Sequence, residues 1–363
     1  MGYSISLAVS VNKLTKDKIQ TVRVMYFKAY NGCSIIHFPF AKIYMLYTKV
    51  SHTFRTSPQH RLHSLQTTFL SSPTYLMLHR STIQLLRLPF SFFLMPVYWF
   101  ALSMVPEVNL FKAILIFILL HLFLYPSSNG YNSYMDRDEG SIGGIEHPMQ
   151  PTKQLFYTTI VLDIAAALIA FVISARFAVA FLVYILCSRL YSYRRIRLKR
   201  FAVWGYLTVI INQGALTFWM VYNGANANTA MPFPWIACIA AAFLIGGFYP
   251  ITQVYQHKAD AKDGVQTISM LLGIRGTFVF CVAMYLIAFG LLFVHFQHTV
   301  QLAQFILLQV FFIPVLFYFF YWVTKVWKNK AAANFKHTMQ MNWLAAGCTN
   351  LAFITLFILN YIG

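Results

Sequence analysis

Long apolar segments dominate this sequence and restrict what it can fold into. Runs of about 20 apolar residues have the length of a helix that crosses the hydrocarbon core of a bilayer. Nine such runs occur, at 84–104, 110–131, 153–174, 176–192, 203–223, 233–256, 276–295, 300–324 and 342–361. Only 10% of the 363 residues are charged, against about 25% in an ordinary soluble domain. The sequence therefore predicts an all-α integral membrane protein with nine transmembrane helices.

Lysine and arginine lie mainly in every second loop between these helices. The segments after the second, fourth, sixth and eighth helices are basic, whereas the opposite loops hold Lys112, Arg176 and little else. Basic loops of membrane proteins face the cytoplasm. We therefore interpret the net charge of +19 as a topology signal that places the basic loops in the cytoplasm. No nucleic-acid-binding motif accompanies the charge, so no nucleic-acid partner is expected.

Residues 1–75 do not follow this pattern. They contain nine lysines and arginines against a single acid, Asp17, and their apolar residues show no clear period. Such a segment fits a transit peptide or a basic segment that lies on a membrane surface, and translation starting at Met77 is a third reading. We expect 1–75 to be a poorly ordered extension outside the site, and 79–363 to form the nine-helix domain.

The acidic residues are few, and most of them gather at two places. Of nine in the chain, six follow the second and sixth predicted helices: Asp136, Asp138, Glu139 and Glu146, then Asp260 and Asp263. Carboxylates at the C-terminal end of a helix face the negative end of its dipole and repel one another. A positive partner is therefore expected, and Mg²⁺ suits because it binds one or two carboxylates together with phosphate oxygens and water.

The spacing within each cluster adds an amide to the carboxylates. Asn132 precedes Asp136 by four residues, and Gln256 precedes Asp260 by four, so each pair is expected on one helix face. An amide oxygen can also bind Mg²⁺. The candidate metal ligands are Asn132, Asp136, Asp138, Glu139, Asp260 and Asp263.

Basic residues near these clusters suggest a phosphate ligand. The loop after the fourth helix reads YSYRRIRLKR, from Tyr191 to Arg200. Such a run is most often a topology signal or a lipid-headgroup contact. Beside a metal site, however, arginine and lysine can hold a diphosphate. Lys199 and Arg200 are the candidates in this loop, and Lys153 is another at the start of the third helix.

Polar residues inside the predicted helices leave several readings open. Asp163 lies in the third apolar run, where an ionisable residue has a functional role, pairs with a base or is protonated. Asn212 and Gln213 lie in the middle of the fifth run. They either line a substrate pocket or make hydrogen bonds between helices.

Two motifs resemble those of a known family. Asn132-Ser-Tyr-Met-Asp136-Arg-Asp-Glu-Gly140 resembles the motif N-D-x-x-D-x-x-x-D of the UbiA superfamily of intramembrane prenyltransferases, which includes 4-hydroxybenzoate polyprenyltransferase. QHKADAKDGVQT, from Gln256 to Thr267, resembles the second motif, D-x-x-x-D-x-x-x-G-x-x-T. The intervening loop is similar to the family's Tyr and Lys/Arg loop. The resemblance covers about 79–363 and implies a nine-helix bundle around a central cavity open to lipid.

The two motifs also depart from the family pattern. Gly140 and Gln256 stand where the family has aspartates. The reduced number of carboxylates implies weaker Mg²⁺ binding, one ion bound well and a second poorly, or a diverged member. The sequence DRDEG, from Asp136 to Gly140, resembles the first motif of bacterial members of the family. This resemblance favours an active protein. We expect an integral protein of a bacterial cytoplasmic membrane, and the basic loops predict both acidic motifs on its cytoplasmic side.

The resemblance implies Mg²⁺-dependent transfer of a prenyl group from a prenyl diphosphate to an aromatic or hydroxyl-bearing acceptor within the membrane. It implies catalytic roles for Asp136 and Asp260. It also implies contacts with a prenyl diphosphate, a small hydrophobic or aromatic acceptor and membrane lipid. The implied substrate-binding residues are Asn132, Lys153, Tyr191, Lys199, Arg200, Asn212 and Gln256. Two alternatives remain: a UbiA-type terpene cyclase without a separate acceptor, and a diverged non-catalytic or transport protein.

Overall fold

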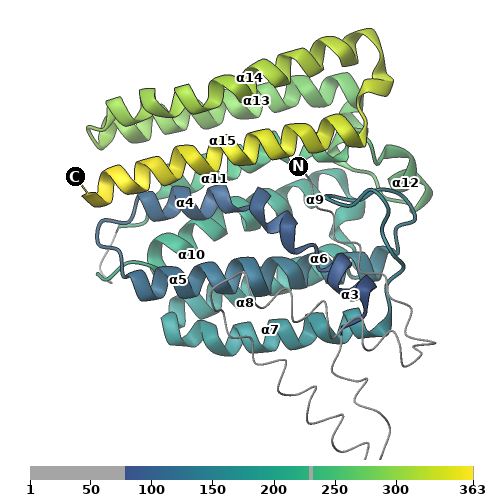
Figure 1. The fold of residues 1–363 in the computed structure, drawn as a ribbon, viewed down its shortest axis with the longest axis horizontal. Coiled ribbons are helices and arrows are strands. Elements are labelled where there is room, and N and C mark those ends of the chain that lie inside the picture. The colour runs from purple at the N-terminus through teal and green to yellow at the C-terminus, as the bar shows by residue number, and fades with distance from the viewer. Residues whose placement is uncertain (1–77, 229–231, 363) are drawn as a thin grey trace, which may run out of the picture. The chain divides into compact units, whose positions relative to one another are not determined.

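The computed structural model describes residues 78–228 and 232–362, which form helices and no β-strand. The predicted extension 1–75 lies outside the described residues. Figure 1 shows the long helices of the described part lying side by side. The all-α fold class predicted from the apolar runs is confirmed.

The helices follow the predicted apolar runs closely. In chain order they are α3 (Arg80–Leu85), η2 (Leu88–Phe93), α4 (Met95–Ser103), α5 (Leu110–Ile118), η3 (Leu119–Leu124), α6 (Tyr125–Asp136), α7 (Lys153–Ile173), α8 (Ala175–Ser192), η4 (Leu198–Arg200), α9 (Ala202–Val209), η5 (Ile210–Leu216), α10 (Thr217–Gly224), α11 (Trp235–Phe248), η6 (Pro250–Gln253), α12 (His257–Lys262), α13 (Ile268–His298), α14 (Leu302–Lys328), η7 (Lys330–Ala332) and α15 (Phe335–Ile362).

The predicted count of nine spans is not confirmed. Within the described part, seven helices are long and apolar enough to cross a membrane. An eighth is added if Arg80–Phe93 and Met95–Ser103, which meet at a bend of 40°, form one span. The continuous helical run from α9 to α10 is not among them. It corresponds to the predicted span 203–223 and carries the polar Asn212 and Gln213 at its centre.

Two of the helical runs contain a π-helical turn, η3 in the second and η5 in the fifth. A π-turn adds a residue to the helix and leaves backbone groups to be satisfied. In η5, Thr217 Oγ1 donates to the Asn212 carbonyl at 2.8 Å, and Asn212 Nδ2 donates to the Thr208 carbonyl at 2.7 Å. The side-chain NH₂ group and the backbone carbonyl of Asn212 therefore bond within the residue's own helical run, and neither bond joins two separate helices.

Close helix packing sets the position of the site. Gly214 of η5 lies against α11 so tightly that a Cβ atom there would lie 2.5 Å from Ala242 Cα. On the other side, Phe100 of α4 stacks on Phe353 of α15, with ring centroids 4.6 Å apart. These contacts hold η5 against α11 and α4 against α15.

Candidate functional site

A polar pocket of about 170 Å³ lies where both acidic motifs meet. Its charged and amide side chains come from Arg87, Asn132, Asp136, Asp138, Lys199, Gln213, Gln253, Gln256 and Asp260. The two motifs are more than 100 residues apart in the sequence, yet residues at the end of α6 and on α12 line the same pocket. We call this the polar pocket.

Asp136 ends α6 with its carboxylate almost fully buried, at 2% side-chain exposure. Asn132 Nδ2 donates to Asp136 Oδ2 at 3.0 Å, which confirms the shared helix face predicted from their spacing. Lys199 Nζ pairs with the same oxygen, and Arg197 lies 3.3 Å from Oδ1. Both carboxylate oxygens of Asp136 therefore already have positive or donor partners.

Asp138 and Asp260 differ from Asp136 in having free carboxylates. Neither makes a side-chain hydrogen bond or ion pair with any residue that the structure describes. Burial raises the pKa of Asp260 to about 6, with further increases from the nearby carboxylates that outweigh the opposing effect of Lys199. Burial and Asp136 likewise raise the pKa of Asp138. Neither carboxylate is therefore directly paired with a cation in the described part of the chain.

Asp263 is held by two arginines of the basic loop. Arg194 Nη1 donates to Asp263 Oδ1 at 2.7 Å, and Arg197 pairs with Oδ2 and donates to the Asp263 carbonyl at 2.9 Å. Burial opposes ionisation, but these hydrogen bonds outweigh it and lower the pKa of Asp263. Asp263 does not line the polar pocket.

The other predicted site residues divide between the pocket and the surface. Tyr191 and Gln256 line the pocket, and Gln256 Nε2 donates to the Ser141 carbonyl at 3.2 Å. In contrast, Glu139, Lys153 and Arg200 are exposed and do not line it. Asn212 is buried but does not reach the pocket either, whereas its neighbour Gln213 does.

Three arginines near the pocket were not singled out by the sequence reasoning. Arg194 and Arg197 belong to the basic loop, but nothing in its sequence indicates which of its cations turn inward. Arg87 is different, because it falls inside the predicted span 84–104. An ionisable residue within a membrane helix is a functional candidate by default, so this signal was present. Arg87 has no ion pair among the described residues.

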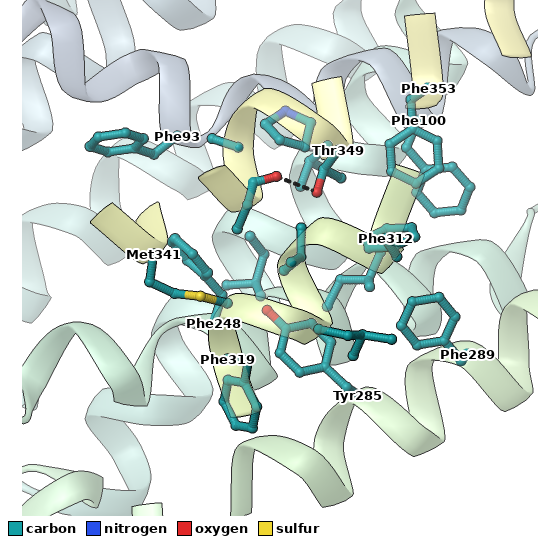
Figure 2. A pocket seen from close by; sticks show the side chains of 18 of the residues that line it. Phe93, Phe100, Phe248, Tyr285, Phe289, Phe312, Phe319, Met341, Thr349 and Phe353 are labelled. Atoms are coloured by element: carbon teal, nitrogen blue, oxygen red, sulfur yellow. Dashed lines mark hydrogen bonds between the residues drawn. The ribbon is translucent and has the colours of Figure 1, made fainter. Parts of the chain in front are cut away.

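An apolar cavity of about 460 Å³ adjoins the polar pocket. The residues labelled in Figure 2 line it: Phe93, Phe100, Phe248, Tyr285, Phe289, Phe312, Phe319, Met341, Thr349 and Phe353. Phe93, Ile245 and Phe248 line both spaces, so these side chains form their shared wall. We call this space the apolar cavity.

The apolar cavity extends away from the shared wall and reaches the outer surface. In Figure 2, Phe93 and Phe248 lie on one side of it and Phe100 and Phe353 on the other. Leu286 and Leu316 line the cavity although they are 69% and 49% exposed. A ligand with a charged head and an apolar tail therefore has a place for each part.

The polar pocket provides suitable oxygen ligands for a hard divalent cation. Among the described residues, no three His, Cys, Asp or Glu side chains come close enough to hold a metal ion by themselves. Mg²⁺ does not require such a cage, because it commonly takes one or two carboxylates and completes its ligands with phosphate oxygens and water. The unpaired carboxylates of Asp138 and Asp260 and the amide of Gln256 match that requirement.

A comparison with protein-family models identifies the family to which most of the chain belongs. The sequence model of the UbiA prenyltransferase family matches residues 93–357, which confirms the predicted resemblance. No curated protein matches the chain.

Solved structures show the same fold. A UbiA homologue from Archaeoglobus fulgidus bound to GPP and Mg²⁺ is 18% identical, with 78% of this chain and 100% of that chain covered and a TM-score of 0.60. The same homologue bound to DMAPP and Mg²⁺ is 19% identical, with 77% and 98% covered and a TM-score of 0.58. A UbiA homologue from Aeropyrum pernix K1 is 16% identical, with 76% and 99% covered and a TM-score of 0.57.

Proposed function

Because the chain belongs to the UbiA prenyltransferase family, we propose that it transfers a prenyl group from a prenyl diphosphate to an acceptor within the membrane, with Mg²⁺ as its cofactor. One observation carries the proposal: the polar pocket, with its carboxylates and cations, shares a wall with the apolar cavity. The structures of UbiA homologues bound to GPP or DMAPP with Mg²⁺ support this reading.

The polar pocket would hold the diphosphate by charge. Lys199 and Arg87 are the cations that line it, and Arg87 has no carboxylate paired with it in the described part of the chain. Arginine binds phosphate oxygens in a fork, whereas lysine acts as a point charge. Asp138 and Asp260 would hold Mg²⁺ against the same phosphates. Bound Mg²⁺ supplies positive charge that offsets the charge developing on the leaving diphosphate.

The transfer step follows from this arrangement. The allylic carbon–oxygen bond breaks, and its electron pair leaves with the diphosphate, which Lys199 and Arg87 stabilise. A nucleophilic carbon or oxygen of the acceptor then bonds to the prenyl carbon and releases a proton. Tyr191, Phe248 and Tyr249 line the polar pocket, and aromatic faces stabilise positive charge. These rings also exclude water, which would otherwise trap the prenyl cation.

The acceptor is proposed to be an aromatic or hydroxyl-bearing molecule that dissolves in the membrane. The exposed Leu286 and Leu316 at the edge of the apolar cavity would let such a molecule, or a long prenyl tail, meet surrounding lipid. We propose that both acidic motifs face the cytoplasm, because the loops that carry them are basic and the positive-inside rule favours that side.

The test is binding of a non-hydrolysable geranylgeranyl thiodiphosphate to the purified full chain in detergent, with and without Mg²⁺. We expect Mg²⁺-dependent binding by the wild type and loss of that dependence in Asp260→Asn. Glu146→Gln is the matched control, because it removes one negative charge from an exposed position near the first motif.

Two results would overturn the proposal. One is the absence of binding by the wild type with Mg²⁺ present. The other is equal binding by the wild type and Asp260→Asn at every Mg²⁺ concentration. If binding occurs as expected, incubation with the natural diphosphate and a panel of phenolic, naphthoate and glycerol-lipid acceptors tests transfer, because a prenylated product must appear together with free diphosphate.

A further inference from the structure

Arg197 lies between the two acidic motifs and contacts both. Its guanidinium is 3.3 Å from Asp136 Oδ1 at the end of α6 and pairs with Asp263 Oδ2 after α12. The Arg197 side chain is only 7% exposed. A buried arginine between two carboxylates occupies the space that a cation bridging those carboxylates would need.

Backbone contacts fix this arginine in place. Arg197 has a left-handed backbone, with φ of 47°, and its amide donates to the Tyr193 carbonyl at 2.7 Å. Its Nη1 donates to the Asp263 carbonyl at 2.9 Å. The loop is tied down a second time where the Gln266 amide donates to the Arg200 carbonyl at 3.1 Å. The basic loop is thus attached to the second motif through both side chains and backbone.

Arg194 extends the same attachment to the first motif. It donates to the carbonyls of Met135 and Asp136 at 2.6 and 3.0 Å, and its Nη1 donates to Asp263 Oδ1 at 2.7 Å. The last carbonyls of a helix carry partial negative charge, so an arginine is favourable there. Arg194 therefore joins the end of α6 to Asp263.

We propose that Arg197 is a fixed internal cation that joins the two acidic motifs and positions Lys199 in the polar pocket, so that Asp263 is a positioning residue and not a metal ligand. This inference rests on the proposed function in one respect, namely that the ligand contacted by Lys199 is a prenyl diphosphate. Lys199 follows Arg197 by two residues and pairs with Asp136 Oδ2, while Arg197 faces Oδ1 of the same carboxylate. Metal contacts are then left to Asp138 and Asp260, whose carboxylates are unpaired.

The arrangement also concerns the departures at Gly140 and Gln256 from the family motifs. Gly140 and Gln256 stand where the family has carboxylates, and Arg197 contacts two of the carboxylates that remain, Asp136 and Asp263. Gly140 is exposed and does not line the polar pocket, so no carboxylate from that position is available to a metal there. The part of the second motif that Arg197 contacts is therefore already paired with a cation.

The first experiment measures how firmly the loop is held, without any ligand. The loop offers trypsin five cleavage sites: Arg194, Arg195, Arg197, Lys199 and Arg200. We expect Asp263→Asn in the purified full chain to be cut in this loop several-fold faster than the wild type, and Asp263→Glu to restore much of the protection. Glu146→Gln is the charge-matched control. If Asp263→Asn is cut no faster than the wild type, Asp263 does not hold the loop in place and the inference is overturned.

The second experiment separates a positioning residue from a metal ligand by the metal preference of thiodiphosphate binding. Thiolates prefer Cd²⁺ over Mg²⁺. Asp260→Cys should therefore bind the thiodiphosphate better with Cd²⁺ than with Mg²⁺, relative to the wild type. Asp263→Cys should keep the wild-type preference while binding about tenfold more weakly with both metals, because Lys199 is no longer held in place.

The outcomes distinguish this inference from the proposed function. A shift of Asp263→Cys toward Cd²⁺ as large as that of Asp260→Cys would show that Asp263 binds the metal and would overturn the inference alone. Wild-type affinity in Asp263→Cys would overturn it as well. If the wild type binds no thiodiphosphate with either metal, the proposed function fails, and the cleavage experiment still decides whether Arg197 and Asp263 hold the loop.

Discussion

Arg189 of α8 pairs with Asp163 of α7, and its Nε donates to Asp163 Oδ2 at 2.9 Å. The two side chains are 19% and 15% exposed. The Arg189 Nη2 group also donates to Ser127 Oγ at 3.0 Å and to the Thr159 carbonyl at 3.2 Å. Of the readings left open for Asp163, the structure supports pairing with a base. The pair fastens α6, α7 and α8 together and lines neither the polar pocket nor the apolar cavity.

Asp163→Asn should lower thermal stability while leaving the site intact. Removing one partner of a fully buried ion pair costs about 3–5 kcal/mol, and the loss here should be smaller because both side chains retain some exposure. The measurement is thermal unfolding of the purified chain in detergent, together with Mg²⁺-dependent thiodiphosphate binding at a temperature where the variant remains folded. Replacing both residues, as Asp163→Leu with Arg189→Met, should recover much of the lost stability. Loss of binding at unchanged stability would instead reveal a direct role for Asp163.

The fold was predictable from the sequence where apolar length decides the structure. The predicted run 153–174 matches α7, which ends at Ile173, because lipid requires all backbone hydrogen bonds to be made within the helix. Local irregularities were not predictable. The predicted run 276–295 is part of the longer α13, which contains a break at Gly273 with φ of 69°. The length of an apolar run does not predict a π-turn or such a break, because the residues on either side of it remain apolar.

The site was predictable only where a helix carries its residues. Asn132 and Asp136 lie on one face of α6, and the 3.6-residue period determines that. Within the loop, the left-handed backbone of Arg197 turns its side chain inward, while Arg195 and Arg200 remain exposed. No sequence period describes such a turn, and nothing else in the sequence distinguishes the five basic residues of this ten-residue loop from one another.

The carboxyl group of Asp260 should titrate near pH 6. Burial raises its pKa to about 6, so below that pH the group is protonated and cannot bind Mg²⁺. Mg²⁺ and the proton compete for the carboxylate, and thiodiphosphate binding at a fixed Mg²⁺ concentration should weaken as the pH falls through 6, by about tenfold per pH unit at most. At higher pH the carboxylate is ionised and binding should level off.

The titration can be measured directly because the chain has only nine acidic residues. Carboxyl-labelled aspartate gives few carbon resonances, and the signal missing from Asp260→Asn identifies the residue. We expect a midpoint near 6 without Mg²⁺ and a lower midpoint once Mg²⁺ and the thiodiphosphate are added. A midpoint below about 4, the ordinary aspartate range, would contradict the prediction.

Lys199→Gln should weaken thiodiphosphate binding, whereas Arg195→Gln should not. Lys199 lines the polar pocket, and a hydrogen bond to a charged group contributes about 1.5–3 kcal/mol, which corresponds to a roughly ten- to hundredfold loss of affinity. Arg195 belongs to the same loop and carries the same charge, but it is exposed and does not line the pocket. Equal losses in the two variants, measured by equilibrium binding at several salt concentrations, would mean that the loop acts only through its overall charge.

Gly247→Ala should narrow the apolar cavity by pushing the ring of Tyr285. A Cβ atom at Gly247 would lie 2.8 Å from two ring atoms of Tyr285, which lines the cavity. The ring is rigid, so it must shift, and overpacking of this kind costs about 1–3 kcal/mol. Tyr285 lies between Phe248 and Phe289 in Figure 2, away from the shared wall. A short dimethylallyl thiodiphosphate should therefore bind nearly as before, while a geranylgeranyl chain should lose affinity.

Gly290→Ala is the matched control for this prediction. It makes the same substitution in α13, the helix that carries Tyr285, but its new Cβ would meet no atom within 4 Å. Comparing the short and long thiodiphosphates within each variant separates a narrowed cavity from a general loss of folded protein. If Gly247→Ala weakens both ligands equally, the substitution destabilises the bundle and does not narrow the cavity. If it weakens neither, the prenyl chain does not pass Tyr285.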